Sequence, residues 1–110
     1  FGTMSSTTGN ITTVNATTVS ASTVNTTSLR KKKKNIHDFN KSALDIINNT
    51  KIVYYTYKDD PSKTEHIGFI ADDTPSELSG IKKDSMVISD TIGVILKAIQ
   101  ELNQKIEELK

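Results

Sequence analysis

A serine beside a run of basic residues is the feature of this sequence that could do chemistry. The segment SLRKKKKNIH, residues 28–37, places Ser28 before one arginine and four consecutive lysines. A serine hydroxyl becomes a nucleophile when a base removes its proton, and a lysine can be that base if its amine is neutral. Neighbouring positive charge and partial burial both favour the neutral amine. The segment could therefore hold a Ser/Lys dyad, a solvated charge cluster at a domain edge, or a nucleic-acid patch.

The distribution of charge argues against a nucleic-acid function. Five of the 14 basic residues lie in residues 30–34, the acids lie downstream, and the net charge is only +1. No aromatic residue interrupts the basic run, and no recognition-helix pattern accompanies it. Because the basicity is local, we expect no nucleic-acid partner.

Composition excludes several other classes of site. The chain has no cysteine, and its two histidines, His37 and His66, do not have a common zinc spacing. No apolar run approaches the roughly 20 residues that span a bilayer, and the N-terminus lacks the order of a signal peptide. Residues 1–4 (FGTM) resemble a cloning remnant. We expect a soluble protein with no metal, no cofactor and no membrane contact.

A short repeat precedes the basic run. Residues 13–27 divide into the pentads TVNAT, TVSAS and TVNTT, which bring Val14, Val19 and Val24 into register. One valine in five residues cannot bury enough surface in a monomer, yet the β-branched content favours extended chain. Residues 1–27 are therefore interpreted as a disordered linker, or as the end of a fibrous β-structure in which several chains share the valines.

The sequence becomes globular in composition after residue 36. Apolar spacing predicts a short helix over residues 39–48, and β-branched and aromatic content predicts strands over residues 52–58 and 66–71. The loop between these strands is rich in Pro, Asp and Ser, so the strands can pair as an antiparallel hairpin. Gly68 indicates a bulge or a close backbone approach. At most a helical turn is expected over residues 74–78. Residues 28–88 are predicted to form a small α+β domain.

The last helix has the clearest periodicity in the chain. Ser89 or Asp90 is its expected N-cap, and it occupies residues 89–110. Its apolar residues alternate at spacings of three and four, which is the a/d seam of a coiled coil: Ile92, Ile95, Ile99, Leu102, Ile106 and Leu109. The pattern leaves two or three strands open, and the seam could also pack on its own domain. The polarity of the remaining positions favours self-association.

A family resemblance covers about residues 28–110. The order Ser28, Lys33, Asn35-Ile36, then HIGFIAD at residues 66–72, then a coiled-coil helix, resembles the C-terminal intramolecular chaperone domain of phage tailspikes and tail fibres. This is the endosialidase-type peptidase family, whose entry motif reads S-D-x-R-L-K-x-N-I. Within it, the sequence is most similar to neck appendage proteins of small Bacillus phages.

The resemblance implies a function and a site. Such a domain helps three fibre chains to register and fold, and then cuts itself off by attack of the serine on the carbonyl before it. Carried over, Ser28 is the nucleophile, Lys33 is the base, and Thr27–Ser28 is the cleaved bond. The partners are then two further copies of the chain, forming a homotrimer, and the upstream fibre portion of the same polypeptide. The expected location is the virion, after synthesis in the host cytoplasm.

The sequence departs from the family motif at three positions. Leu29, Lys31 and Lys32 replace the acid, the arginine and the leucine of the motif. In a regular α-helix Lys32, at i+4, would face Ser28, whereas Lys33 would lie about 140° around the axis. The motif register names Lys33, so we expect a turn at Ser28 that is not regular α-helix. The alternative function is a coiled-coil trimerisation tip that does not cleave.

Overall fold

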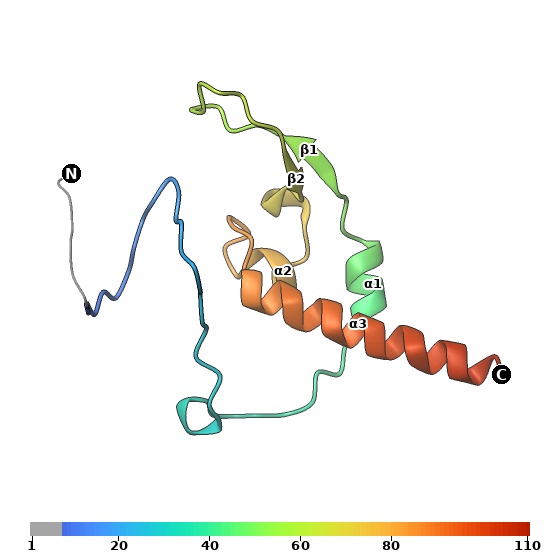
Figure 1. Ribbon diagram of the computed structural model, residues 1–110. Coiled ribbons are helices and arrows are strands. Elements are labelled where there is room, and N and C mark those ends of the chain that lie inside the picture. Colours follow the sequence, from blue (N-terminus) through green and yellow to red (C-terminus); the bar gives the residue numbers. More distant parts are fainter. Residues whose placement is uncertain (1–7) are drawn as a thin grey trace.

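A computed structural model describes residues 8–110, so the segment interpreted as a cloning remnant lies outside the described residues. An extended stretch leads through a small 3-10 turn to a domain built on one long helix (Figure 1). The elements follow in this order: η1 (Arg30–Lys32), α1 (Ala43–Asn48), β1 (Val53–Tyr55), β2 (His66–Gly68), η2 (Ala71–Asp73), α2 (Ser76–Ser79) and α3 (Ile88–Glu108). The predicted α+β class, with a hairpin, short helices and a long C-terminal helix, is confirmed.

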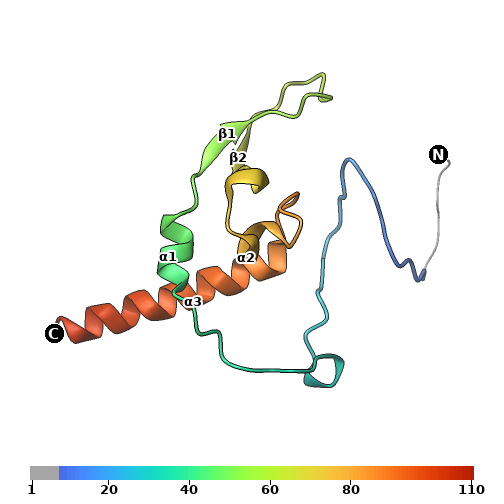
Figure 2. The same cartoon turned by 180° about the vertical axis from the view of Figure 1, so that it is seen from behind.

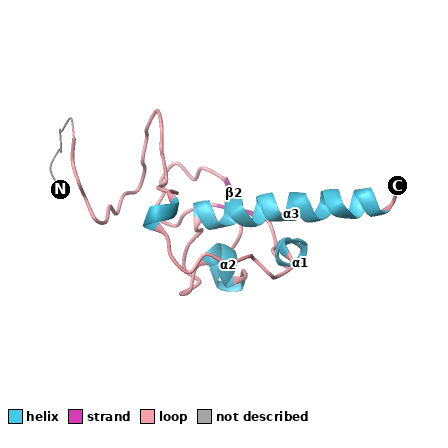
Figure 3. Cartoon of the chain, turned by 90° about the horizontal axis from the view of Figure 1, so that it is seen from below, coloured by secondary structure: helices cyan, strands magenta, loops and turns pink. Residues whose placement is uncertain are grey.

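The core of the domain lies between α3 and two short helices. Helices α1 and α2 both pack on one side of α3 (Figure 3). The buried apolar side chains come from these three helices: Ala43, Ile46, Leu78, Val94 and Ala98. Because this core is small, it supplies little hydrophobic stabilisation, as is common for domains of this size.

The two strands form the predicted antiparallel hairpin, in which Tyr54 pairs with Ile67 and Tyr55 with His66. Both strands are shorter than the predicted ranges 52–58 and 66–71. The first gives way to a turn in which the Asp60 N–H donates to the Tyr57 carbonyl at 3.2 Å. The second ends because η2 begins at Ala71. A Cβ built on Gly68 would lie 3.3 Å from Cε1 of Tyr55, so the close neighbour of this glycine is a tyrosine side chain and not another backbone segment.

Helix α1 begins later than its apolar spacing predicted. It starts at Ala43 rather than at residue 39, because the Ser42 hydroxyl accepts a hydrogen bond from the Asp45 N–H at 3.2 Å and caps the first turn. Its end at Asn48 agrees with the prediction. Helix α2 provides the expected single turn, displaced from residues 74–78 to Ser76–Ser79.

Helix α3 begins earlier than predicted, and its N-cap is Val87 rather than Ser89 or Asp90. The Val87 N–H donates to the Leu78 carbonyl at 2.9 Å, and the Thr91 N–H donates to the Val87 carbonyl at 2.8 Å. The end of α2 therefore fixes the backbone where α3 starts. This tertiary contact takes the place of a side-chain cap.

Residues 8–29 run as extended chain away from the domain, without helix or strand (Figures 1 and 2). The repeat valines Val14, Val19 and Val24 are 63%, 72% and 78% exposed in the single chain. Among residues 8–110, no helix combines the length and the apolar composition needed to cross a bilayer.

Candidate active site

A tight turn brings Ser28 and Lys33 together; residues 28–33 are called the dyad turn below. The Lys32 N–H donates to the Leu29 carbonyl and the Lys33 N–H donates to the Arg30 carbonyl, each at 3.0 Å. These are the i to i+3 bonds of a 3-10 helix, which winds more tightly than an α-helix. Lys33 leaves the turn in extended conformation, with φ −119° and ψ 154°. The turn is thus not a regular α-helix.

The Lys33 Nζ lies 2.7 Å from the Ser28 Oγ, at hydrogen-bond distance. In this arrangement the ammonium donates to the hydroxyl oxygen. A neutral amine at the same position would instead accept the hydroxyl proton, which is the geometry that a general base requires. Of the two lysines weighed from the sequence, the structure pairs Lys33 with the serine.

The dyad turn is exposed, as is every residue from 28 to 38. Thr27 precedes the serine in the extended chain that leads into the turn. Three of the remaining basic residues, Arg30, Lys31 and Lys32, make up η1 itself. Within residues 8–110, no three acidic or histidine side chains are grouped so that they could hold a metal ion.

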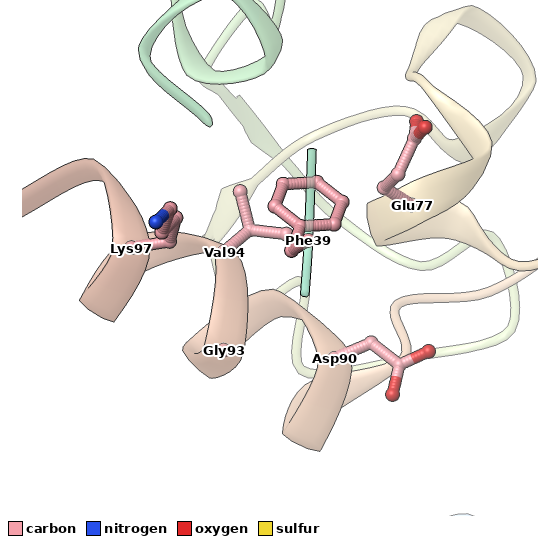
Figure 4. A pocket seen from close by; sticks show the side chains of 6 residues that line it. All are labelled: Phe39, Glu77, Asp90, Gly93, Val94 and Lys97. Atoms are coloured by element: carbon pink, nitrogen blue, oxygen red, sulfur yellow. The ribbon is translucent and has the colours of Figure 1, made fainter. Parts of the chain in front are cut away.

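The segment after the dyad turn, residues 34–42, is called the arm, and its last residues attach to the domain. Phe39 lies against α3 in an open groove of about 380 Å³ between α2 and α3 (Figure 4). The groove is lined by Phe39, Glu77, Asp90, Gly93, Val94 and Lys97. Lys41 forms a salt bridge of 2.5 Å with Glu77, and this bond holds the pKa of the Glu77 carboxyl below its ordinary value.

Glu101 of α3 receives the start of α1. Its Oε2 accepts from the Ala43 N–H at 2.8 Å, and its Oε1 accepts from the Leu44 N–H at 3.2 Å and from the Ser42 hydroxyl at 3.3 Å. The first N–H groups of a helix have no partner within the helix, and they favour a negative charge. The hydrogen bond from the Ala43 N–H, chiefly, lowers the pKa of the Glu101 carboxyl.

Sequence reasoning missed both glutamates of the arm attachment. Glu101 contacts residues 57 to 59 positions away, and Glu77 bonds a lysine 36 positions away. No local spacing predicts contacts over such separations, so only the tertiary structure reveals them.

Helix α3 uses different faces for the core and for the predicted seam. Thr91, Val94 and Ala98 are buried against α1 and α2. The seam residues are exposed by between 43% and 87%: Ile92, Ile95, Ile99, Leu102, Ile106 and Leu109. The seam therefore does not pack on its own domain in the single chain.

His66 lies in the hairpin, on the opposite side of α3 from the dyad turn (Figure 1). Its ring stacks on Tyr55 with centroids 5.6 Å apart and meets Tyr57 edge-on at 5.2 Å. Asp72 and Asp73 form part of η2. These residues belong to the hairpin end of the domain and not to the dyad turn.

Comparison with known proteins gives one family. Residues 28–78, just under half of the chain, match the model of a peptidase family described as the chaperone of endosialidase. No curated protein and no solved structure matches the chain. The matched segment begins at Ser28 and includes the dyad turn, the arm and the hairpin. Over residues 28–78, the chain is therefore similar to this peptidase family, and the match supports a chaperone role.

Proposed function

We propose that this chain is an intramolecular chaperone that trimerises, helps an upstream phage fibre or appendage to fold, and then releases itself by cutting Thr27–Ser28. The observation that carries the proposal is the 2.7 Å contact between Lys33 Nζ and Ser28 Oγ. The family match supports the chaperone role and the self-cleaving kind of activity. The cut would fall where the valine repeats end.

The chemistry follows from the position of the hydroxyl. A neutral Lys33 amine takes the Ser28 hydroxyl proton while Oγ attacks the carbonyl carbon of Thr27, closing a five-membered ring. The bond from this carbon to the Ser28 nitrogen then breaks, and the lysine returns the proton to the departing amine. The product is an ester between the Thr27 acyl group and Oγ. Water hydrolyses it, leaving a Thr27 carboxylate and a chain that starts at Ser28 with a free amine.

The exposed seam supports trimerisation. An isolated helix with this apolar stripe is poorly stable in water, and a coiled coil would bury the stripe. Isoleucine occupies every a position, Ile92, Ile99 and Ile106, and the first d position is Ile95. Isoleucine at both a and d favours trimers, but the leucines at the other two d positions, Leu102 and Leu109, favour dimers, so the choice of three copies rests on the resemblance to phage fibre chaperones. Because the core uses another face of α3, the domain could keep its fold while three copies associate.

The test of cleavage is the intact mass of the purified chain over time. We expect the parent to lose residues 1–27 and to leave a species that begins at Ser28. Ser28→Ala should stay at full length, whereas Ser22→Ala, a matched loss of an exposed hydroxyl upstream, should cleave as the parent does. Loss of residues 1–27 in Ser28→Ala would contradict the proposal, because it would point to an external protease.

A second candidate function is a coiled-coil trimerisation tip that stays attached to its fibre. The exposed seam of α3 favours it as strongly as it favours the cleaving chaperone. The same mass measurement separates the two, since a tip remains at full length in the parent as well as in Ser28→Ala.

A further inference from the structure

The arm joins the domain at one place on α3, beside the predicted seam. Within the described part of the chain, residues 28–38 form hydrogen bonds only among themselves, and attachment to the domain begins at Phe39. The arm ends where α1 begins, and there three donors converge on one carboxylate: the Ser42 hydroxyl and the N–H groups of Ala43 and Leu44. The acceptor, Glu101, is the residue before the seam residue Leu102.

The C-terminal half of α3, which carries Glu101, packs against few other residues in a single chain. The last buried residue of α3 is Ala98, and every residue from 102 to 110 is exposed. Helix ends without tertiary partners fray. Burial of Ile99, Leu102 and Ile106 in a coiled coil would fix this half of the helix. It would thereby hold the Glu101 carboxylate at the start of α1.

From this geometry we infer that Glu101 is a positioning residue that couples assembly of the C-terminal helix to self-cleavage. The inference rests on the proposed function. Assembly orders the second half of α3, Glu101 then holds the first turn of α1, and the arm leaves the domain from a fixed point. A 3-10 turn of three residues has little stability of its own. The population of the Ser28–Lys33 contact therefore depends on how the arm is held.

The first test measures the rate at which the species beginning at Ser28 appears. Displacement of a reacting group by about 1 Å can slow a reaction by about 100-fold, so we expect Glu101→Ala to slow cleavage by at least about tenfold. Glu101→Gln keeps an acceptor oxygen for the Ala43 N–H and should recover part of the rate. The matched control is Glu108→Ala, one heptad further along the same face of α3, which should cleave at the parent rate. Trimer mass should be unchanged in all three variants.

A second readout separates positioning from a loss of stability. In the full-length Ser28→Ala background, hydrogen exchange at the Ala43 and Leu44 amides should be slow in the assembled chain. It should become at least about tenfold faster on adding Glu101→Ala, but not on adding Glu108→Ala. Lys63→Val, which strains the hairpin loop at a position with φ 54° and away from the arm, should leave the cleavage rate near that of the parent even if it lowers stability.

The outcomes are distinguishable. A Glu101→Ala trimer that cleaves at the parent rate, or whose Ala43 and Leu44 amides exchange as slowly as before, overturns the inference while the proposed function stands. A parent chain that stays at full length overturns the proposed function and, with it, the role of Glu101 in cleavage. The exchange measurement then still decides whether Glu101 holds the start of α1.

Discussion

Asn35 adopts a left-handed backbone conformation, with φ 55°, two residues after Lys33. Asparagine tolerates this region, glycine enters it freely, and a β-branched residue there is strained. The conformation turns the chain from the dyad turn into the arm. The left-handed backbone conformation thus explains why asparagine suits this position.

Asn35→Val should slow self-cleavage by about tenfold, because strain of about 1–3 kcal/mol would displace the dyad turn, whereas Asn35→Gly should cleave nearly as the parent does. Intact mass over time measures both rates. The matched control is Lys63→Val, which introduces the same strain at φ 54° in the hairpin loop and should leave the rate unchanged. Equal rates for Asn35→Val and the parent would count against this role.

The Glu101 carboxylate makes the start of α1 sensitive to acid. Its pKa is lowered from an ordinary 4.5 by the hydrogen bonds that it accepts, so its contribution to stability is present above that value. The contribution is lost as the pH falls through the lowered folded pKa. We expect urea unfolding of the full-length Ser28→Ala chain to show a loss of stability below about pH 4.5 that is smaller in the Glu101→Gln version. Equal pH profiles for the two chains would contradict this account.

The residues of the site differ in how far the sequence reveals them. Ser28 and Lys33 stand in a recognisable motif register, and the structure brings their side chains together. The register alone could not supply the geometry, since regular α-helix would have paired Lys32 with Ser28. Glu77 and Glu101 act through contacts between segments that are far apart in sequence, and no local spacing predicts such contacts.

Substitution by alanine is expected to have opposite effects on stability at two glycines, Gly80 and Gly93. Gly80 ends α2 with φ 84° and ψ 168°, a region that almost only glycine occupies, and an added Cβ would lie 3.3 Å from Cγ2 of Val87. Gly93 lies inside α3, and an added Cβ there would meet nothing within 4 Å.

Gly80→Ala should therefore lower the free energy of unfolding by about 1–3 kcal/mol, and Gly93→Ala should raise it by up to about 1 kcal/mol. Equilibrium urea unfolding at one fixed chain concentration, in the Ser28→Ala background, measures both changes. A stabilising Gly80→Ala would show that the turn between α2 and α3 tolerates a side chain. A destabilising Gly93→Ala would show that the groove beside Phe39 closes on this position.

The helices and strands were predictable from sequence where a segment has one clear apolar periodicity or one clear residue composition. The long helix and the hairpin follow from the apolar spacing and the β-branched content. Their boundaries did not follow, because bonds from other segments set them. Val87 starts α3 through the Leu78 carbonyl, and η2 shortens the second strand. A scan for capping residues favours Ser89 and Asp90 and has no access to such bonds.

At the scale of the whole molecule, the exposed seam leads us to expect a trimer whose assembly precedes cleavage. Leu102→Glu would place charges at the centre of the coiled coil, so we expect sedimentation to give a monomer and intact mass to give no cleavage. Gln100→Glu adds the same charge outside the seam and should leave both properties as in the parent. A Leu102→Glu monomer that cleaves at the parent rate would separate cleavage from assembly.

The most direct test of the account compares two neighbouring lysines. The rate at which the species beginning at Ser28 appears should fall below detection in Lys33→Ala and stay within about twofold of the parent in Lys32→Ala. This result is expected because only Lys33 lies 2.7 Å from the Ser28 hydroxyl and can act as its base. Cleavage at Thr27–Ser28 that persists in Lys33→Ala, or that is lost equally in Lys32→Ala, would contradict the assignment of Ser28 and Lys33 as the catalytic dyad.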